Sequence, residues 1–185
     1  MNISMYNASI PVMIKMLGNL EAIIDKAIAH ATARKIDEAA FVEARLFPDM
    51  FNLARQVRVA TDMSKGAGAR LAGIEIPKFE DNEKTLPELK ARLRKCIDFL
   101  KTLTPAQIDG SEDKAISLTV GGNKLDFKGL DYLNSWALPN FYFHVTTAYN
   151  LLRHGGVEIG KMDYLGKVQE VGGKRSEPQR RFITH

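Results

Sequence analysis

Residues 138–163, LPNFYFHVTTAYNLLRHGGVEIGKMD, carry the pattern that decides the fold of this chain. Apolar side chains recur in this stretch every three or four residues, which predicts an amphipathic helix whose apolar face other helices must cover. Pro139 suits the first position of this helix, so a helical run through residues 130–138 must bend or break before it. Gly155 and Gly156 suit its end, because glycine readily takes the left-handed conformation that caps helices.

Three polar residues lie on one face of this predicted helix. Asn140 and His144 are four residues apart, which on a helix places their side chains roughly 6 Å apart at Cβ, and Thr147 follows one turn later. The apolar residues around them recur at the spacing of an amphipathic helix. His144 is therefore predicted at the edge of a packed helix interface or inside it.

The length and composition are typical of one soluble domain. A chain of 185 residues with 45% hydrophobic residues is large enough to bury roughly 70% of the surface of its unfolded form. Cys96 is the single cysteine, which excludes an internal disulfide and favours a reducing compartment. The first residues lack a basic leader, and no run of ~18 apolar residues occurs. We therefore expect a cytoplasmic protein without a membrane-spanning segment.

The positive charge is concentrated near residue 185. The formal net charge is +4, and residues 172–185 hold +3 of it, because four basic residues stand against Glu177. Residues 1–171 are nearly neutral at +1. Domains that bind nucleic acid carry a basic face, so no nucleic-acid partner is expected. We predict a single helical domain over residues 1–168 and a mobile basic tail over residues 169–185.

A second long helix is predicted to begin at Pro48 and Asp49. Proline suits the first helical position, and a carboxylate is favourable near a helix N-terminus. On this helix Asp49, Asn52 and Gln56 follow one another at spacings of three and four residues. They form a second polar line that is predicted to face inward, toward the line that contains His144.

Two more long helices follow from periodicity and capping. Apolar spacing predicts a helix from about residue 5 or 9 to residue 33, with His30 as a surface residue near its end. Thr85 and Glu88 form a capping box, which predicts the start of another helix. Cys96 lies on the apolar stripe of that helix. It is interpreted as a small buried hydrophobic residue, because no local His or Asp could activate it as a nucleophile.

The apolar period changes shortly before the last helix. Apolar and polar residues alternate over 116–120 and again over 125–127, with Gly121 and Gly122 between them, which predicts a β-hairpin. A nucleotide-binding loop is the alternative interpretation of the paired glycines, but a P-loop lysine and a dinucleotide fingerprint are both absent. Four long helical patterns with unequal connectors and one hairpin predict an all-α bundle with long crossovers.

Four segments of the chain carry a family resemblance. They are SIPVMIKMLGNL, LFPDMFNLARQV, LAGIEIPKFEDNEKTLPEL and LPNFYFHVTTAYNLLRHGGVEIGKMDYLG. These segments resemble a bacterial domain-of-unknown-function family, the one numbered nineteen-ninety-three, which belongs to the DinB/YfiT-like superfamily. The resemblance covers roughly residues 1–168. It implies a DinB/YfiT-like four-helix bundle that is usually dimeric.

The resemblance also implies a metal site from which this sequence departs. Many superfamily members bind a divalent metal through three histidines, one from the second helix and two that are four residues apart on the last helix. Some relatives use such a site for thiol-dependent transferase or isomerase chemistry. Here the last helix carries Asn140 and His144, and the second helix has no histidine. A weaker and less selective site would consist of His144, Asn140 and Asp49, with zinc, nickel or manganese as the ion.

Two classes of function remain open from the sequence. The first is a pocket between the second and last helices that binds a small molecule or a metal. Whether it is enzymatic stays open from the sequence, and for an enzyme the resemblance implies metal- or thiol-dependent transferase or isomerase chemistry. The predicted lining is Asp49, Gln56, Asn140, His144 and Tyr149. The second is a non-catalytic protein that acts through its surface, in which His144 is a buried residue hydrogen-bonded to Gln56 or Asn140.

A homodimer is the expected assembly. The superfamily resemblance implies it, and the last motif holds more large aromatic residues than one face of one helix can bury. Trp136, Tyr142 or Phe143 is predicted to lie in the contact between the two copies.

Overall fold

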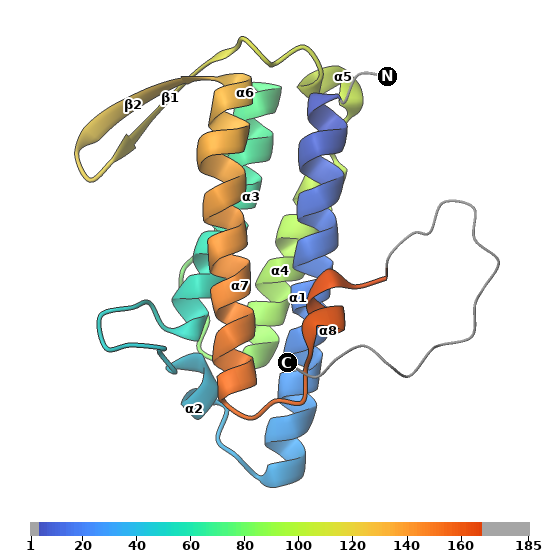
Figure 1. The fold of residues 1–185 in the computed structure, drawn as a ribbon, viewed down its shortest axis with the longest axis vertical. Helices are drawn as coiled ribbons and strands as arrows, with labels where there is room; N and C mark the ends of the chain where they lie inside the picture. The colour runs from blue at the N-terminus through green and yellow to red at the C-terminus, as the bar shows by residue number, and fades with distance from the viewer. Residues whose placement is uncertain (1–3, 168–185) are drawn as a thin grey trace, which may run out of the picture.

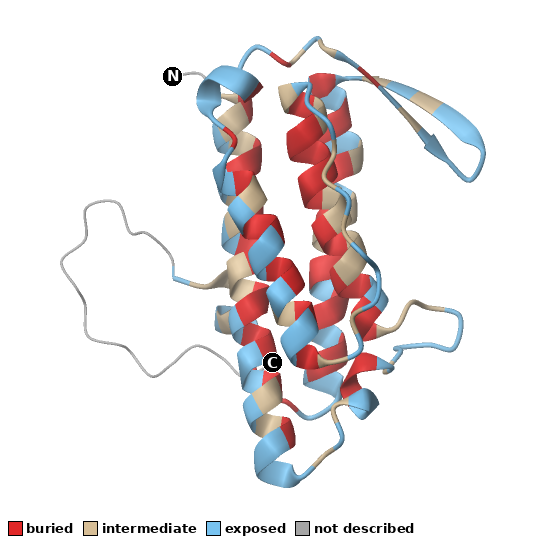
Figure 2. Cartoon of the chain, turned by 180° about the vertical axis from the view of Figure 1, so that it is seen from behind, coloured by how far each residue is buried: buried red, intermediate tan, exposed pale blue. Residues whose placement is uncertain are grey.

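The computed structural model describes residues 4–167, and four long helices packed side by side form the body of the protein (Figure 1). These helices are α1 (Met5–Arg34), α3 (Leu53–Ala72), α4 (Leu86–Lys101) and α7 (Leu138–His154). α1 packs against α4, α3 packs against α7, and α3 also contacts α4. Their buried faces point toward a common core (Figure 2). The predicted all-α bundle is confirmed.

α1 begins at Met5, the earlier of the two predicted starts. The Ser4 hydroxyl accepts a hydrogen bond from the backbone N–H of Asn7 at 3.2 Å, which caps the helix. Pro11 consequently lies inside the helix and cannot donate to the preceding turn. Met5 and Ile10 are buried in the core, so the packing of this first part of α1 offsets the missing hydrogen bond.

The expectation that the second long helix starts at Pro48 is wrong, because α3 starts at Leu53. The Asn52 side chain is the N-cap, and its Nδ2 also donates to Glu43 Oε2 at 2.6 Å. The backbone N–H of Leu53 donates to the carbonyl of Ala44 at 3.0 Å. These contacts close residues 44–52 into a loop before the helix begins.

The capping box predicted for α4 is confirmed. The backbone N–H of Glu88 donates to Thr85 Oγ1 at 3.3 Å, and Glu88 Oε2 accepts the backbone N–H of Thr85 at 3.1 Å. Both groups belong to the first turn, where helix N–H groups have no partner within the helix. The start of α4 is therefore set by residues that lie three positions apart.

The predicted β-hairpin is also confirmed. β1 (Ala115–Val120) pairs antiparallel with β2 (Asn123–Lys128). Gly121 and Gly122 form the turn, and both have positive φ, a backbone conformation that glycine adopts without steric cost. The hairpin extends outward from the end of the bundle where α6 and the last turns of α3 lie (Figure 1).

The bend expected before Pro139 takes the form of a π-helical segment. α6 (Gly129–Asp131) leads into the π-helix η1 (Tyr132–Ala137), which leads into α7. Pro139 lies in the first turn of α7, where its lack of an N–H is tolerated. The proline predicts a bend or a break in the helix, but the π-helical turns of η1 keep the backbone helical, so the chain is helical from Gly129 to His154.

Three short helices complete the part of the chain that the structure describes. They are α2 (Ala39–Val42), α5 (Pro105–Ile108) and α8 (Lys161–Leu165). Within residues 4–167, no helix combines the length and the apolar character that crossing a membrane requires. The tail predicted over residues 169–185 lies outside the described residues.

Candidate functional site

A buried pair of polar side chains connects α7 to α3. The exposed fraction is 8% for His144 and 1% for Gln56, and His144 Nδ1 lies 2.7 Å from Gln56 Oε1. The amide nitrogen of Gln56 donates to the carbonyl of Phe51 at 3.2 Å. The amide oxygen is therefore the atom that faces the imidazole, and Nδ1 donates the hydrogen bond. In neutral His144 this leaves the lone pair on Nε2.

The surroundings of His144 favour the neutral ring. Burial lowers the pKa of His144 below its ordinary value, because an imidazolium ion loses solvation when it is buried. Among the described residues, the hydrogen bond of the imidazole is the one to Gln56. Nε2 of a neutral and oriented imidazole can accept a hydrogen bond or a proton from another molecule.

Aromatic side chains flank the imidazole on two sides. The Phe51 ring is nearly parallel to it, with 6.4 Å between ring centroids and 11° between planes. The Phe143 ring meets it edge to face, with centroids 5.2 Å apart. The Arg55 guanidinium covers the Phe51 ring at 3.8 Å from its centroid. Phe143 is 56% exposed, so this side of the site borders the surface.

Of the five side chains predicted to line a pocket, the structure brings Gln56 and His144 into contact. Asp49 is exposed in the loop before α3. Asn140 is half-buried and donates to the carbonyl of Trp136 in the preceding turn at 2.7 Å. Tyr149 packs edge to face on Tyr164 of α8, with centroids 5.8 Å apart. Asn140 and Tyr149 therefore contact other residues, and Asp49 lies outside α3.

The residues around His144 do not fit the three-histidine metal site of the superfamily. Within residues 4–167, no group of three or more His, Cys, Asp or Glu side chains is placed to hold a metal ion. Asp49, the predicted carboxylate ligand, is in an exposed loop, and Nδ1 of His144 is bonded to Gln56. A divalent transition metal needs several converging donors, and the side chains around His144 do not supply them.

An arginine network was not predicted from the sequence. Arg92 of α4 is 4% exposed and donates to Thr61 Oγ1 at 2.7 Å, to Asp62 Oδ1 at 3.0 Å and to Glu83 Oε1 at 2.9 Å. Burial alone would raise the pKa of Glu83, but hydrogen bonds from Arg92 and Arg58 lower it. The network holds the crossover before α4 against α3. The sequence signal that could have predicted this network is Arg92, which adjoins the apolar stripe of α4 and follows the acidic residues Glu80, Asp81 and Glu83.

Cys96 has the structural role that its position predicts. Its side chain is fully buried, and Sγ lies 3.3 Å from Ser64 Oγ. Burial raises the pKa of the Cys96 thiol to about 11. The thiolate, which is the reactive form, is therefore scarce at neutral pH, and the prediction of a buried hydrophobic residue is confirmed.

The helical bundle places the protein in the DinB-like class. A crystal structure of a DinB family member protein from Shewanella denitrificans is similar to it, with a TM-score of 0.81 and 39% sequence identity over 91% of this chain and 95% of that chain. The chain belongs to the family described as Domain of unknown function (DUF1993), whose model matches residues 5–165. A comparison with curated proteins found no match. The family resemblance of the four sequence segments is confirmed.

Proposed function

We propose that the Gln56–His144 pair is the polar centre of a small-molecule-binding site between α3 and α7. The observation that carries this proposal is the state of His144, a neutral imidazole whose Nδ1 is occupied and whose Nε2 has no partner among residues 4–167. Nε2 is reachable from solvent, because Ser111 Oγ is the one fully buried side-chain N or O atom without a partner among the described residues. A molecule that donates a hydrogen bond to Nε2 and binds only the folded state would stabilise the folded protein.

The surroundings define the class of ligand. The walls next to the imidazole are the rings of Phe51 and Phe143, which favour an apolar or aromatic body. The described residues give His144 no ion pair, so nothing in its first contacts selects a charged group. We therefore propose a neutral ligand with an apolar body and one hydroxyl or amide donor. His144 accepts from that donor, and Gln56 holds the ring in place.

The test combines a search for bound molecules with a binding assay. Native mass spectrometry of protein purified without a tag or chelator reports any small molecule that co-purifies. An NMR screen with phenol, benzyl alcohol and benzamide, at concentrations near ~1 mM, then reports weak binding to the site. Shifts at His144 and Phe143 that disappear in His144→Ala support the proposal. The matched control is His154→Ala, an exposed histidine on the same helix.

The proposal fails if no molecule co-purifies and none of the three compounds shifts the His144 signals. It also fails if His144→Ala binds them as the wild type does. His154→Ala separates a specific loss from a general effect of removing a histidine from α7.

A second proposal concerns assembly, and it rests on the exposure of Phe143. We propose that the protein forms a homodimer through the surface around this residue. Trp136 packs against Phe127, and Tyr142 packs against Phe141, so both are partly covered within one chain. Phe143 is 56% exposed, and Phe47 in the loop before α3 is 64% exposed. Large exposed aromatic residues favour a protein contact.

Light scattering tests the dimer directly. The wild type is expected to have twice the mass of the 20.6 kDa chain, and Phe143→Ser is expected to shift it toward the monomer. Leu130→Ser is the control, because Leu130 is 44% exposed on α6, outside the proposed contact. A monomeric wild type at concentrations of ~10 μM would contradict the proposal.

A further inference from the structure

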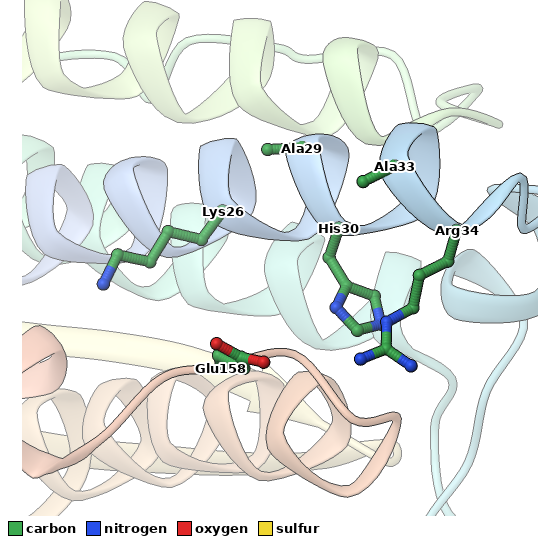
Figure 3. Close-up of a pocket in the computed structure, with 6 residues that line it drawn as sticks. All are labelled: Lys26, Ala29, His30, Ala33, Arg34 and Glu158. Carbon is green, nitrogen blue, oxygen red and sulfur yellow. The ribbon is translucent and has the colours of Figure 1, made fainter.

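A groove separates the second half of α1 from the segment that follows α7 (Figure 3). Its volume is about 320 Å³, at the small end of the range for ligand pockets, and it is open to solvent. Its location differs from that of the Gln56–His144 pair, which lies between α3 and α7. The lining residues are Lys26, Ala29, His30, Ala33, Arg34 and Glu158.

One wall of the groove is basic. Lys26, His30 and Arg34 stand four residues apart on α1, so their side chains share one face of the helix. Lys26 is already paired, because its Nζ lies 2.6 Å from Asp163 Oδ1. Among the described residues, the Arg34 guanidinium and the His30 ring nitrogens have no hydrogen-bond or ion-pair partner, and both side chains line the groove (Figure 3). They leave several N–H donors available to a ligand.

The opposite wall contributes a carboxylate. Val157 and Ile159 are buried, and Glu158 between them is exposed, as expected where alternate side chains of an extended segment point in opposite directions. Glu158 makes no ion pair with the residues that the structure describes. Figure 3 places its carboxylate on the far side of the groove from the α1 helix.

A glycine of the segment after α7 lies beside His30. Gly156 has a φ of +90°, and a Cβ placed on it would lie 3.9 Å from His30 Nε2. The N–H of Gly156 donates to the carbonyl of Arg153, and the N–H of Val157 donates to the carbonyl of Leu152. The segment is therefore anchored to the end of α7, and the wall beside His30 carries no side chain at this position.

We propose that this groove binds a small zwitterion, that is, a molecule with a carboxylate and a protonated amine. Arg34 binds the carboxylate through its planar pair of N–H groups, with His30 as an additional donor. Glu158 accepts hydrogen bonds from the amine across the groove. The two signs of charge face each other without pairing directly, so a molecule that carries both is favoured over one that carries a single charge. The volume suits a molecule as small as an amino acid.

Titrations of the ¹⁵N-labelled protein test the proposal. The probes are glycine, β-alanine and 4-aminobutyrate, which separate the amine and the carboxylate by increasing distances, with acetate and methylammonium as single-charge controls. At least one zwitterion is expected to shift the amides of Ala29, Ala33 and Gly156 and to bind about tenfold more tightly than either control. Arg34→Gln and Glu158→Gln are each expected to remove this advantage, while Glu158→Gln still binds acetate.

Lys101→Gln and Glu75→Gln, which change exposed residues outside the groove, are expected to bind like the wild type. The proposal is overturned if zwitterions bind no better than acetate or methylammonium, because the groove then recognises only one sign of charge. It is also overturned if none of the probes shifts the groove amides, or if the two groove variants bind as well as the two controls.

Discussion

The Gln56–His144 hydrogen bond can be tested by a double-mutant cycle with Gln56→Met and His144→Phe. Each substitution approximately preserves side-chain volume and removes one partner of the pair. In Gln56→Met the buried Nδ1–H of His144 loses its acceptor, and the carbonyl of Phe51 loses its donor. Each buried group left without a partner costs about 1–3 kcal/mol. We expect Gln56→Met to lower the free energy of unfolding by about 2–4 kcal/mol, since two groups are affected.

The double variant distinguishes the pair from unrelated packing effects. His144→Phe leaves Gln56 Oε1 without a donor and is expected to cost about 1–3 kcal/mol. In the double variant both members of the pair are gone, so its cost should fall below the sum of the single costs by about 1–2 kcal/mol. Urea denaturation measures these values, with the m-value as a check that the unfolded state is unchanged. His154→Phe is the control for an exposed histidine on the same helix.

The pH dependence of stability gives an independent measurement. The pKa of His144 is lowered in the folded protein, so the unfolded state binds the proton more tightly. Above the ordinary histidine pKa of about 6.5 the group has no effect on stability, and below it stability falls until the pKa of the folded state is reached. His144→Phe should therefore lose less stability than the wild type between about pH 7 and pH 5. The buried pair is refuted if the unfolding free energies of the wild type and His144→Phe fall equally with decreasing pH. It is also refuted if the losses of the two single variants simply add in the double variant, or if each single loss is below about 0.5 kcal/mol.

Three further substitutions or reactions test other parts of the fold. Arg92→Met should lower the free energy of unfolding by about 1–3 kcal/mol in urea denaturation, because Thr61, Asp62 and Glu83 lose a shared donor. The loss is limited because Arg58 still pairs with Glu83 and Lys65 still pairs with Asp62. A loss below about 0.5 kcal/mol would show that the crossover is held by other contacts. Gly129→Ala should lower the free energy of unfolding by at least about 2 kcal/mol, because the added Cβ would lie 1.9 Å from the carbonyl oxygen of Ser111. A melting temperature equal to that of the wild type would show that the backbone shifts freely. In the native protein, Cys96 should react with a thiol reagent only as fast as the protein unfolds, because burial shields the thiol and raises its pKa to about 11. Rapid labelling without denaturant would contradict this expectation.

The features that the sequence predicts best depend on residues close together in the chain. The start of α4 depends on Thr85 and Glu88, which lie in one helical turn. The hairpin turn depends on Gly121 and Gly122, which take positive φ. The helical periods of the four long segments reflect one buried face each, and burial in any bundle requires that pattern. Local geometry therefore made the bundle predictable.

The start of α3 shows where a local signal is ambiguous. Pro48 and Asp49 suit the first turn of a helix, but Asn52 is also a good N-cap. The choice depends on the contact of Asn52 with Glu43, nine residues away, and on the loop that this contact closes. The difference changes the location of Asp49, which lies in an exposed loop and not on the inward face of α3.

The sequence by itself determined which residues have buried faces and which polar residues accompany them, because periodicity and capping act over one or two helical turns. Only the tertiary structure decided which of these polar residues meet. Gln56 and Asn140 were both candidate partners for His144. The structure pairs the imidazole with Gln56, 88 positions away, while Asn140 bonds to the carbonyl of Trp136 in its own helix. Arg34 and Glu158 likewise face one groove only because the chain after α7 returns to α1, and such long-range packing leaves no periodic signal in either segment.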